Sequence, residues 1–151
     1  MTATMRFPYA DFHARLEQVA SDASLEALGV LPPLLERLLV PPESRAKVMT
    51  SLALLLTARK ATLQAAFDTT LAADELRRYQ KFAKPGKPSA HIVQLRQKQA
   101  AARQATSIAR QSLIKAATVF VRDAGIDVPE RTPLDVFIID WIGTHVPADD
   151  A

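Results

Sequence analysis

Cysteine is absent from this chain of 151 residues, and glycine is scarce, with four residues. The lack of cysteine excludes disulfides, thiolate metal ligands and thiol nucleophiles, and it is typical of a reducing compartment. The glycines are isolated from one another, so no glycine-rich loop can hold a phosphate group with its backbone amides. These absences remove several common classes of enzyme.

Aromatic residues make up 6% of the chain and hydrophobic residues 48%, with alanine and leucine prominent. Alanine and leucine lose little conformational freedom in a helix, so this composition favours helices over strands. The densest apolar run, Leu52–Leu56, is much shorter than the roughly 20 residues that cross a bilayer. The N-terminal residues also lack the continuous apolar segment of a secretory signal. We therefore expect a cytoplasmic protein that does not contact a membrane.

Acidic residues are missing from residues 76–122, a window that contains eleven lysine or arginine residues. All 16 aspartate and glutamate residues lie outside the window, so the formal net charge of +3 conceals a separation of charge. Residues 1–75 have a net charge of −2, the window +11, and residues 123–151 −6. Charge separated in this way creates a local field that attracts polyanions or an acidic partner.

The chain is long enough for one ordinary core, and we predict a single all-α domain over residues 1–151. The predicted fold is a bundle of five or six helices in which two long helices, about 43–67 and 90–124, pack antiparallel. The shorter helices are predicted at residues 10–20, from Ser24 to the stop at Gly29, at 72–83 and from Thr132 onward, and residues 34–39 are predicted to form a short helical piece.

Breaks between the helices are predicted from local composition. The Asp68-Thr69-Thr70 sequence is expected to end the first long helix, and residues 85–89, which contain two prolines and a glycine, to form a surface loop. Residues 90–124 contain neither proline nor glycine, so they are expected to form one uninterrupted helix that ends at Gly125.

The C-terminal apolar segment starts with a favourable helix signal. Thr132 is expected to cap the helix, Pro133 to occupy its first position and Asp135 to lie in its first turn. The residues that follow are apolar almost all round, so this helix must be buried in the core or against another chain. A strand over Val136–Ile139 is the alternative, because β-branched residues cluster there. Asp149-Asp150 is expected to belong to a frayed tail.

Alanine recurs every seven residues in the second long helix. Leu95, Ala102, Ala109 and Ala116 form this row, and small residues in such a row allow close approach of a partner helix. The partner is expected to be either the helix at 43–67 of the same chain or the same helix of a second copy.

The residue types needed for catalysis do not converge. The three histidines, His13, His91 and His145, lie on three segments and fit no metal-binding spacing. Asp135 and Asp140 are five residues apart and lie on different faces of their predicted helix. We therefore expect a protein that is not an enzyme, with no metal ion and no cofactor.

Basic side chains in the acid-free window are the strongest candidates for a binding site. Arginines at 96, 103 and 110 repeat every seven residues, so they lie along one side of the predicted helix. Arginine can bind phosphate through two hydrogen bonds. The predicted nucleic-acid-binding residues are Arg77, Arg78, Lys81, Lys84, Lys87, Arg96, Arg103 and Arg110.

The sequence thus favours a non-enzymatic accessory or regulatory protein that binds nucleic acid, with DNA as the expected form. The alternative is a structural or adaptor protein that binds an acidic protein surface, another protein or itself, as a homo-oligomer. Its predicted interface residues are Ala102, Ala109, Ala116, Phe137 and Trp141. A helix-turn-helix motif over Leu56–Tyr79 fits less well, because Thr69 occupies a usually apolar position and no glycine marks the turn.

Overall fold

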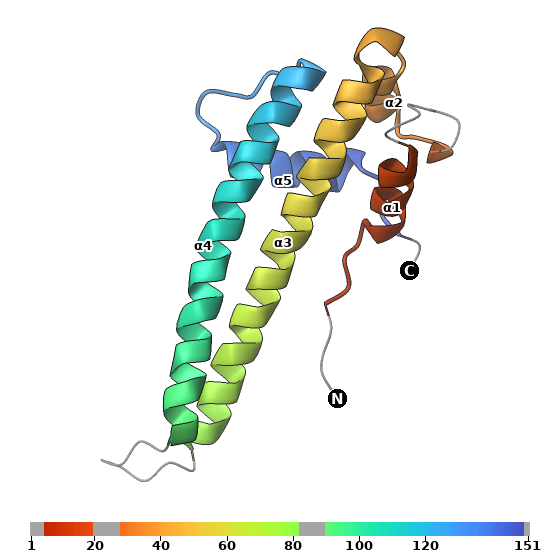
Figure 1. Ribbon diagram of the computed structural model, residues 1–151. Coiled ribbons are helices and arrows are strands. Elements are labelled where there is room, and N and C mark those ends of the chain that lie inside the picture. Colours follow the sequence, from red (N-terminus) through yellow and green to blue (C-terminus); the bar gives the residue numbers. More distant parts are fainter. Residues whose placement is uncertain (1–4, 20–27, 82–89, 150–151) are drawn as a thin grey trace.

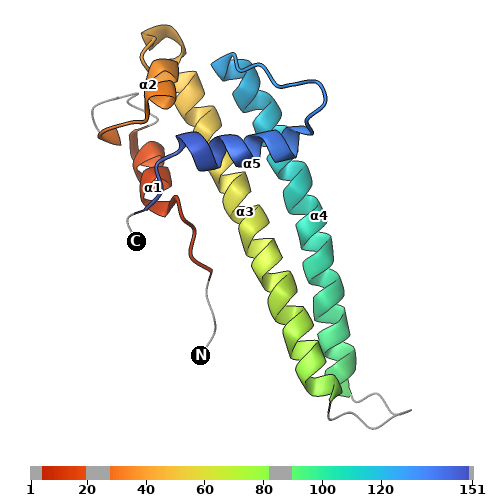
Figure 2. The ribbon, with the colours of Figure 1, turned by 180° about the vertical axis from the view of Figure 1, so that it is seen from behind.

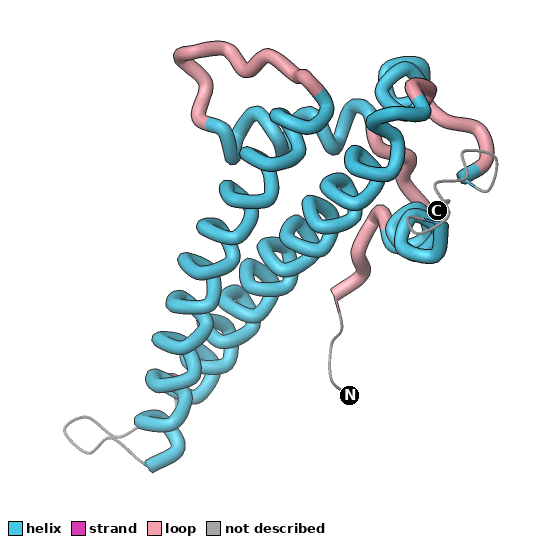
Figure 3. Tube along the Cα trace, turned by 45° about the horizontal axis from the view of Figure 1, so that its top comes forward, coloured by secondary structure: helices cyan, strands magenta, loops and turns pink. Residues whose placement is uncertain are grey.

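The computed structural model describes residues 5–19, 28–81 and 90–149, and these residues contain helices but no strand (Figures 1 and 3). The predicted all-α fold is confirmed. The predictions that fall on residues 20–27 and 82–89, the helix start at Ser24 and the loop at 85–89, lie outside the described residues. The helices are α1 (Ala10–Val19), α2 (Pro33–Leu39), α3 (Pro42–Gln80), α4 (Ala90–Ala124) and α5 (Leu134–His145).

Two long antiparallel helices form the frame of the molecule. α3 and α4 run side by side over most of their lengths (Figures 1 and 2). Near one end, α1 and α2 pack on α3, and α5 crosses both long helices (Figure 2). We call this end the head. The other end, residues 65–80 and 90–109, projects beyond the short helices and is called the arm.

The main core lies in the head and draws on all five helices. Leucines from α1, α2 and α3 are buried there with Phe120 of α4 and Trp141 of α5. The rings of Phe120 and Trp141 meet edge to face, with 5.0 Å between their centroids. A second and much smaller cluster, Leu76, Ile92 and Leu95, lies in the arm. Most of the hydrophobic stabilisation therefore belongs to the head, because burial is concentrated there.

The predicted break at Asp68-Thr69-Thr70 is wrong, because α3 continues without interruption to Gln80. The Thr69 and Thr70 hydroxyls donate hydrogen bonds to the carbonyls of Ala65 and Ala66, one turn earlier. The Asp68 carboxylate likewise accepts a hydrogen bond from Gln64. The polar side chains thus bond within the helix instead of ending it, and the continuous helix also leaves no turn for a helix-turn-helix motif.

The C-terminal segment is a helix, so the strand alternative for Val136–Ile139 is wrong. Its start differs from the prediction: Pro133 precedes the first helical residue, and the Thr132 side chain forms no capping hydrogen bond. Ile138, Trp141 and Ile142 are buried, whereas Val136 and Ile139 are exposed. The helix therefore buries one side against α3 and α4 instead of being enclosed all round.

The C-terminal tail is anchored at Asp149, contrary to the expectation of a frayed end there. The Asp149 amide donates a hydrogen bond to the Pro8 carbonyl. The Asp149 carboxylate accepts one from the Asp11 amide in the first turn of α1, at 2.9 Å. Asp150 lies outside the described residues.

Candidate nucleic-acid interface

The helices of the arm approach closely because small side chains line their contact. Ala65 and Ala72 of α3 and Ala109 of α4 are buried there. The Thr69 hydroxyl lies 3.1 Å from the Thr106 hydroxyl across the contact. α3 of the same chain is therefore the partner of the seven-residue alanine pattern in α4.

Arg96, Arg103 and Arg110 form a row along one side of α4. All three are exposed. A helix rises 1.5 Å per residue, so residues seven apart are separated by about 10.5 Å along its axis. α4 contains no proline or glycine, so the helix that carries these three arginines is continuous. Such a row can follow a chain of phosphate groups.

The last arginine of the row has an acidic partner. The Nε atom of Arg110 lies 2.9 Å from Oδ2 of Asp135, where α5 crosses α4. The Arg110 side chain is 67% exposed, whereas that of Asp135 is 14% exposed. The positive charge of Arg110 is therefore already balanced within the chain.

Arg96 and Arg103 have no ion-pair partner within the described residues. The residues three and four positions away from them on α4, which are their neighbours on the helix surface, are all uncharged. The nearby Lys98, by contrast, pairs with Glu75 of α3 at 3.3 Å. The positive charge of the row is thus left uncompensated at two consecutive positions.

The Lys98–Glu75 pair lies on the other side of the arm. Residues two apart on a helix point in nearly opposite directions. Lys98 is two residues from Arg96, and Glu75 is two residues from Arg77. Arg77 of α3 therefore lies on the same side of the arm as Arg96 and Arg103. We call these three residues the arginine face.

The remaining predicted contacts divide into three groups. The Nη1 atom of Arg77 lies 3.8 Å from Oδ1 of Asp74, one turn earlier in α3. This distance is at the long limit for an ion pair. Arg78 and Lys81 are exposed and form no ion pair in the described part of the chain. Lys84 and Lys87 lie outside the described residues.

The predicted interface residues lie within the fold of one chain. Ala109 and Trp141 are buried, and Ala102, Ala116 and Phe137 are half-buried. The three alanines lie along the contact with α3, and Trp141 packs on Phe120. In this conformation α3 covers Ala109, so the buried middle of the alanine row is not open to a second copy.

Sequence reasoning missed the carboxylate of Asp123, whose side chain is 3% exposed. It accepts a hydrogen bond from the Ser51 hydroxyl, and its Oδ1 atom lies 3.4 Å from Nζ of Lys47. The hydrogen bond from Ser51, with a smaller effect of Lys47, lowers the pKa of Asp123 below its ordinary value. Ser51 and Asp123 are 72 residues apart, so no local pattern links them.

The described residues contain no candidate metal-binding site, because no three histidine or acidic side chains come together there. The histidines lie on three different helices, in contact with Thr57, Tyr79 and Trp141 respectively. Among the helices of the described chain, none combines the length and apolarity needed to cross a bilayer.

Comparison with protein-family models, curated proteins and solved structures gave no match.

Proposed function

We propose that the protein is a non-enzymatic, nucleic-acid-binding accessory protein that holds the phosphate backbone of duplex DNA on the arginine face. One observation carries the proposal: Arg96 and Arg103 are exposed, lie seven residues apart and have no ion-pair partner in the described part of the chain. Arginine binds phosphate in a bidentate geometry, and each neutralised phosphate releases condensed counterions.

The site favours a duplex over a single strand. Proteins that bind single strands stack bases on exposed aromatic rings. Tyr79 is two residues from Arg77, so its side chain points to the other side of the arm. There the centroid of its ring lies 4.4 Å from the centroid of the His91 ring. Within the described residues, the arginine face thus offers positive charge without a stacking platform. Such phosphate contacts position DNA without reading its sequence.

The salt dependence of binding tests the proposal. We compare the wild type with an Arg96→Ala/Arg103→Ala variant, using a short fluorescent duplex and anisotropy at several salt concentrations. The slope of log affinity against log salt changes by about 0.9 for each phosphate contact. We therefore expect the double variant to have a slope shallower by about 1.8.

A matched control separates a local site from the net charge. The Arg37→Ala/Lys60→Ala variant removes two exposed basic side chains from α2 and α3, outside the acid-free window. Its formal net charge equals that of the test variant, and we expect its slope to match that of the wild type. Equal slopes for all three proteins, or no binding by the wild type, would contradict the proposal.

A structural or adaptor role is the second candidate. It is favoured by Val136 and Ile139, which are exposed on the outer side of α5. A Val136→Glu/Ile139→Glu variant should then lose a self-association that light scattering detects in the wild type. A wild type that is monomeric at all concentrations argues against the homo-oligomer form of this role.

A further inference from the structure

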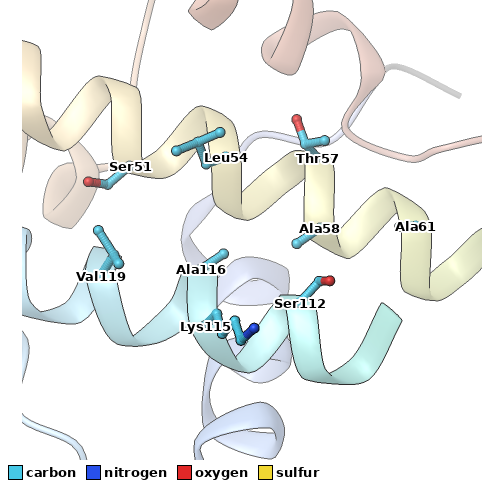
Figure 4. Close-up of a pocket in the computed structure, with 9 residues that line it drawn as sticks. All are labelled: Ser51, Leu54, Thr57, Ala58, Ala61, Ser112, Lys115, Ala116 and Val119. Atoms are coloured by element: carbon cyan, nitrogen blue, oxygen red, sulfur yellow. The ribbon is translucent and has the colours of Figure 1, made fainter. Parts of the chain in front are cut away.

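A groove runs between α3 and α4 in the head, on the side opposite α5 (Figure 4). It has a volume of about 460 Å³, within the range of roughly 300–1,000 Å³ that small-molecule sites occupy. Its lining residues are Ser51, Leu54, Thr57, Ala58, Ala61, Ser112, Lys115, Ala116 and Val119.

Small side chains create this hollow. Ala58 of α3 and Ala116 of α4 face each other across it (Figure 4), where larger residues would fill the space. Leu54 forms one wall and is 58% exposed, and Val119 lies across from it on α4. The floor and walls are thus apolar and open to solvent, which favours an apolar ligand because its surface would be removed from water.

The charge at the groove is positive. Lys115 is its only charged lining residue, and it has no ion-pair partner in the described part of the chain. Ser112 lies beside it on α4, with its hydroxyl available (Figure 4). The buried carboxylate of Asp123, which accepts a hydrogen bond from the lining residue Ser51, is already engaged by Lys47 and Arg122. An anionic group is therefore attracted to one edge of an apolar hollow.

We infer that the groove binds a free, single-chain carboxylate amphiphile, with its acyl chain between Ala58 and Ala116 and its carboxylate at Lys115. The alkyl stem of the lysine can pack along the chain while its ammonium group meets the carboxylate. The apolar floor argues against a phosphodiester ligand, so this site is independent of the arginine face.

Calorimetric titration with dodecanoate, below the concentration at which it forms micelles, tests the inference. We expect saturable binding of one molecule per chain. Decanoate should bind more weakly by about fourfold for each methylene removed. Lys115→Gln should weaken dodecanoate binding by about tenfold and leave dodecanol binding unchanged. The control variant Lys60→Gln removes an exposed lysine of α3 outside the groove and should bind like the wild type.

A second variant tests the apolar half of the site. Ala61 is exposed at the groove edge, so Ala61→Phe should fill the groove without disturbing the contact between α3 and α4. We expect it to lose dodecanoate binding at wild-type helix content by circular dichroism, whereas Ala100→Phe, at an exposed position of the arm, should retain binding.

Three results would overturn the inference. The first is the absence of saturable binding below micelle formation. The second is equal binding by the wild type, Lys115→Gln and Ala61→Phe. The third is self-association of the wild type that Ala61→Phe abolishes, because a second copy of the chain would then occupy the groove.

Discussion

Arg110 of α4 and Asp135 of α5 form an ion pair in the head, at its border with the arm, with 2.9 Å between Nε and Oδ2. Arg110 continues the row of Arg96 and Arg103, but the acidic first turn of α5 neutralises it. The position of α5 therefore sets how many arginines of the row are available to an anionic partner.

Replacing Asp135 with asparagine should release Arg110 for binding. We expect Asp135→Asn to bind duplex DNA more tightly than the wild type, with a salt slope steeper by about 0.9. An exposed ion pair contributes about 0–1 kcal/mol, so the free energy of unfolding should fall little. Asp140→Asn, also on α5, makes the same change in net charge at an exposed position. If both variants gain affinity equally, the pairing with Arg110 is not the cause.

The alanine contact between α3 and α4 should resist larger side chains. Ala109 is buried against α3, so Ala109→Leu should lower the free energy of unfolding by about 1–3 kcal/mol through overpacking. The exposed Ala101 of the same helix provides a control, because Ala101→Leu should change stability by less than about 0.5 kcal/mol. Urea unfolding followed by circular dichroism measures both, and similar losses would mean that the contact is not tightly packed.

The Ser51–Asp123 hydrogen bond predicts a stability that depends on pH. It keeps the pKa of Asp123 below the ordinary value of 3.8, so folding favours the ionised carboxylate. The ionised carboxylate therefore adds to the free energy of unfolding. Its contribution is fully present above the ordinary pKa, and it is lost as the pH falls through that value toward the lower pKa of the folded state.

The substitution Ser51→Ala tests this dependence. At neutral pH we expect it to lower the free energy of unfolding by about 1.5–3 kcal/mol, because a hydrogen bond to a buried charged group is lost. The difference from the wild type should shrink in acid, as Asp123 becomes protonated in both proteins. Unfolding curves at several pH values provide the measurement, and a difference that stays constant into acid would argue against an ionised Asp123.

The contact of Asp149 with the Asp11 amide replaces a helix cap that α1 lacks in its own sequence. We expect Asp149→Ala to cost about 1 kcal/mol, the usual effect of removing a capping side chain. Hydrogen exchange of the Asp11 amide should accelerate in the variant. Asp127→Ala, at an exposed position between α4 and α5, should leave both quantities unchanged.

Local rules predicted the elements whose ends are encoded locally. The bounds of α4 follow from the absence of proline and glycine in residues 90–124 and from Gly125, whose positive φ of 68° ends the helix. The same rules failed at Thr69, because its hydroxyl bonds to a carbonyl one turn earlier in α3 and also contacts Thr106. A preference for turns does not reveal whether a neighbouring helix will accept the side chain.

The candidate site was predictable only in part, for a related reason. Spacing alone places Arg96, Arg103 and Arg110 in one row, since helix periodicity is local. Which of them is neutralised depends on where α5 crosses α4, and that position follows from the packing of Trp141 on Phe120 in the head. No pattern within residues 90–124 contains this information.

The uneven distribution of buried side chains gives the molecule a gradient of local stability. α3 is 39 residues long, and its head portion shares the main core, whereas the described part of the arm has the small cluster of Leu76, Ile92 and Leu95 and three buried alanines. Segments with few buried apolar contacts open at a lower free energy than the whole fold. Backbone amides should therefore exchange with solvent sooner around Leu76 and Ile92 than around Leu55 and Phe120, and a polyanion clamped along the arm should slow that exchange without altering the head.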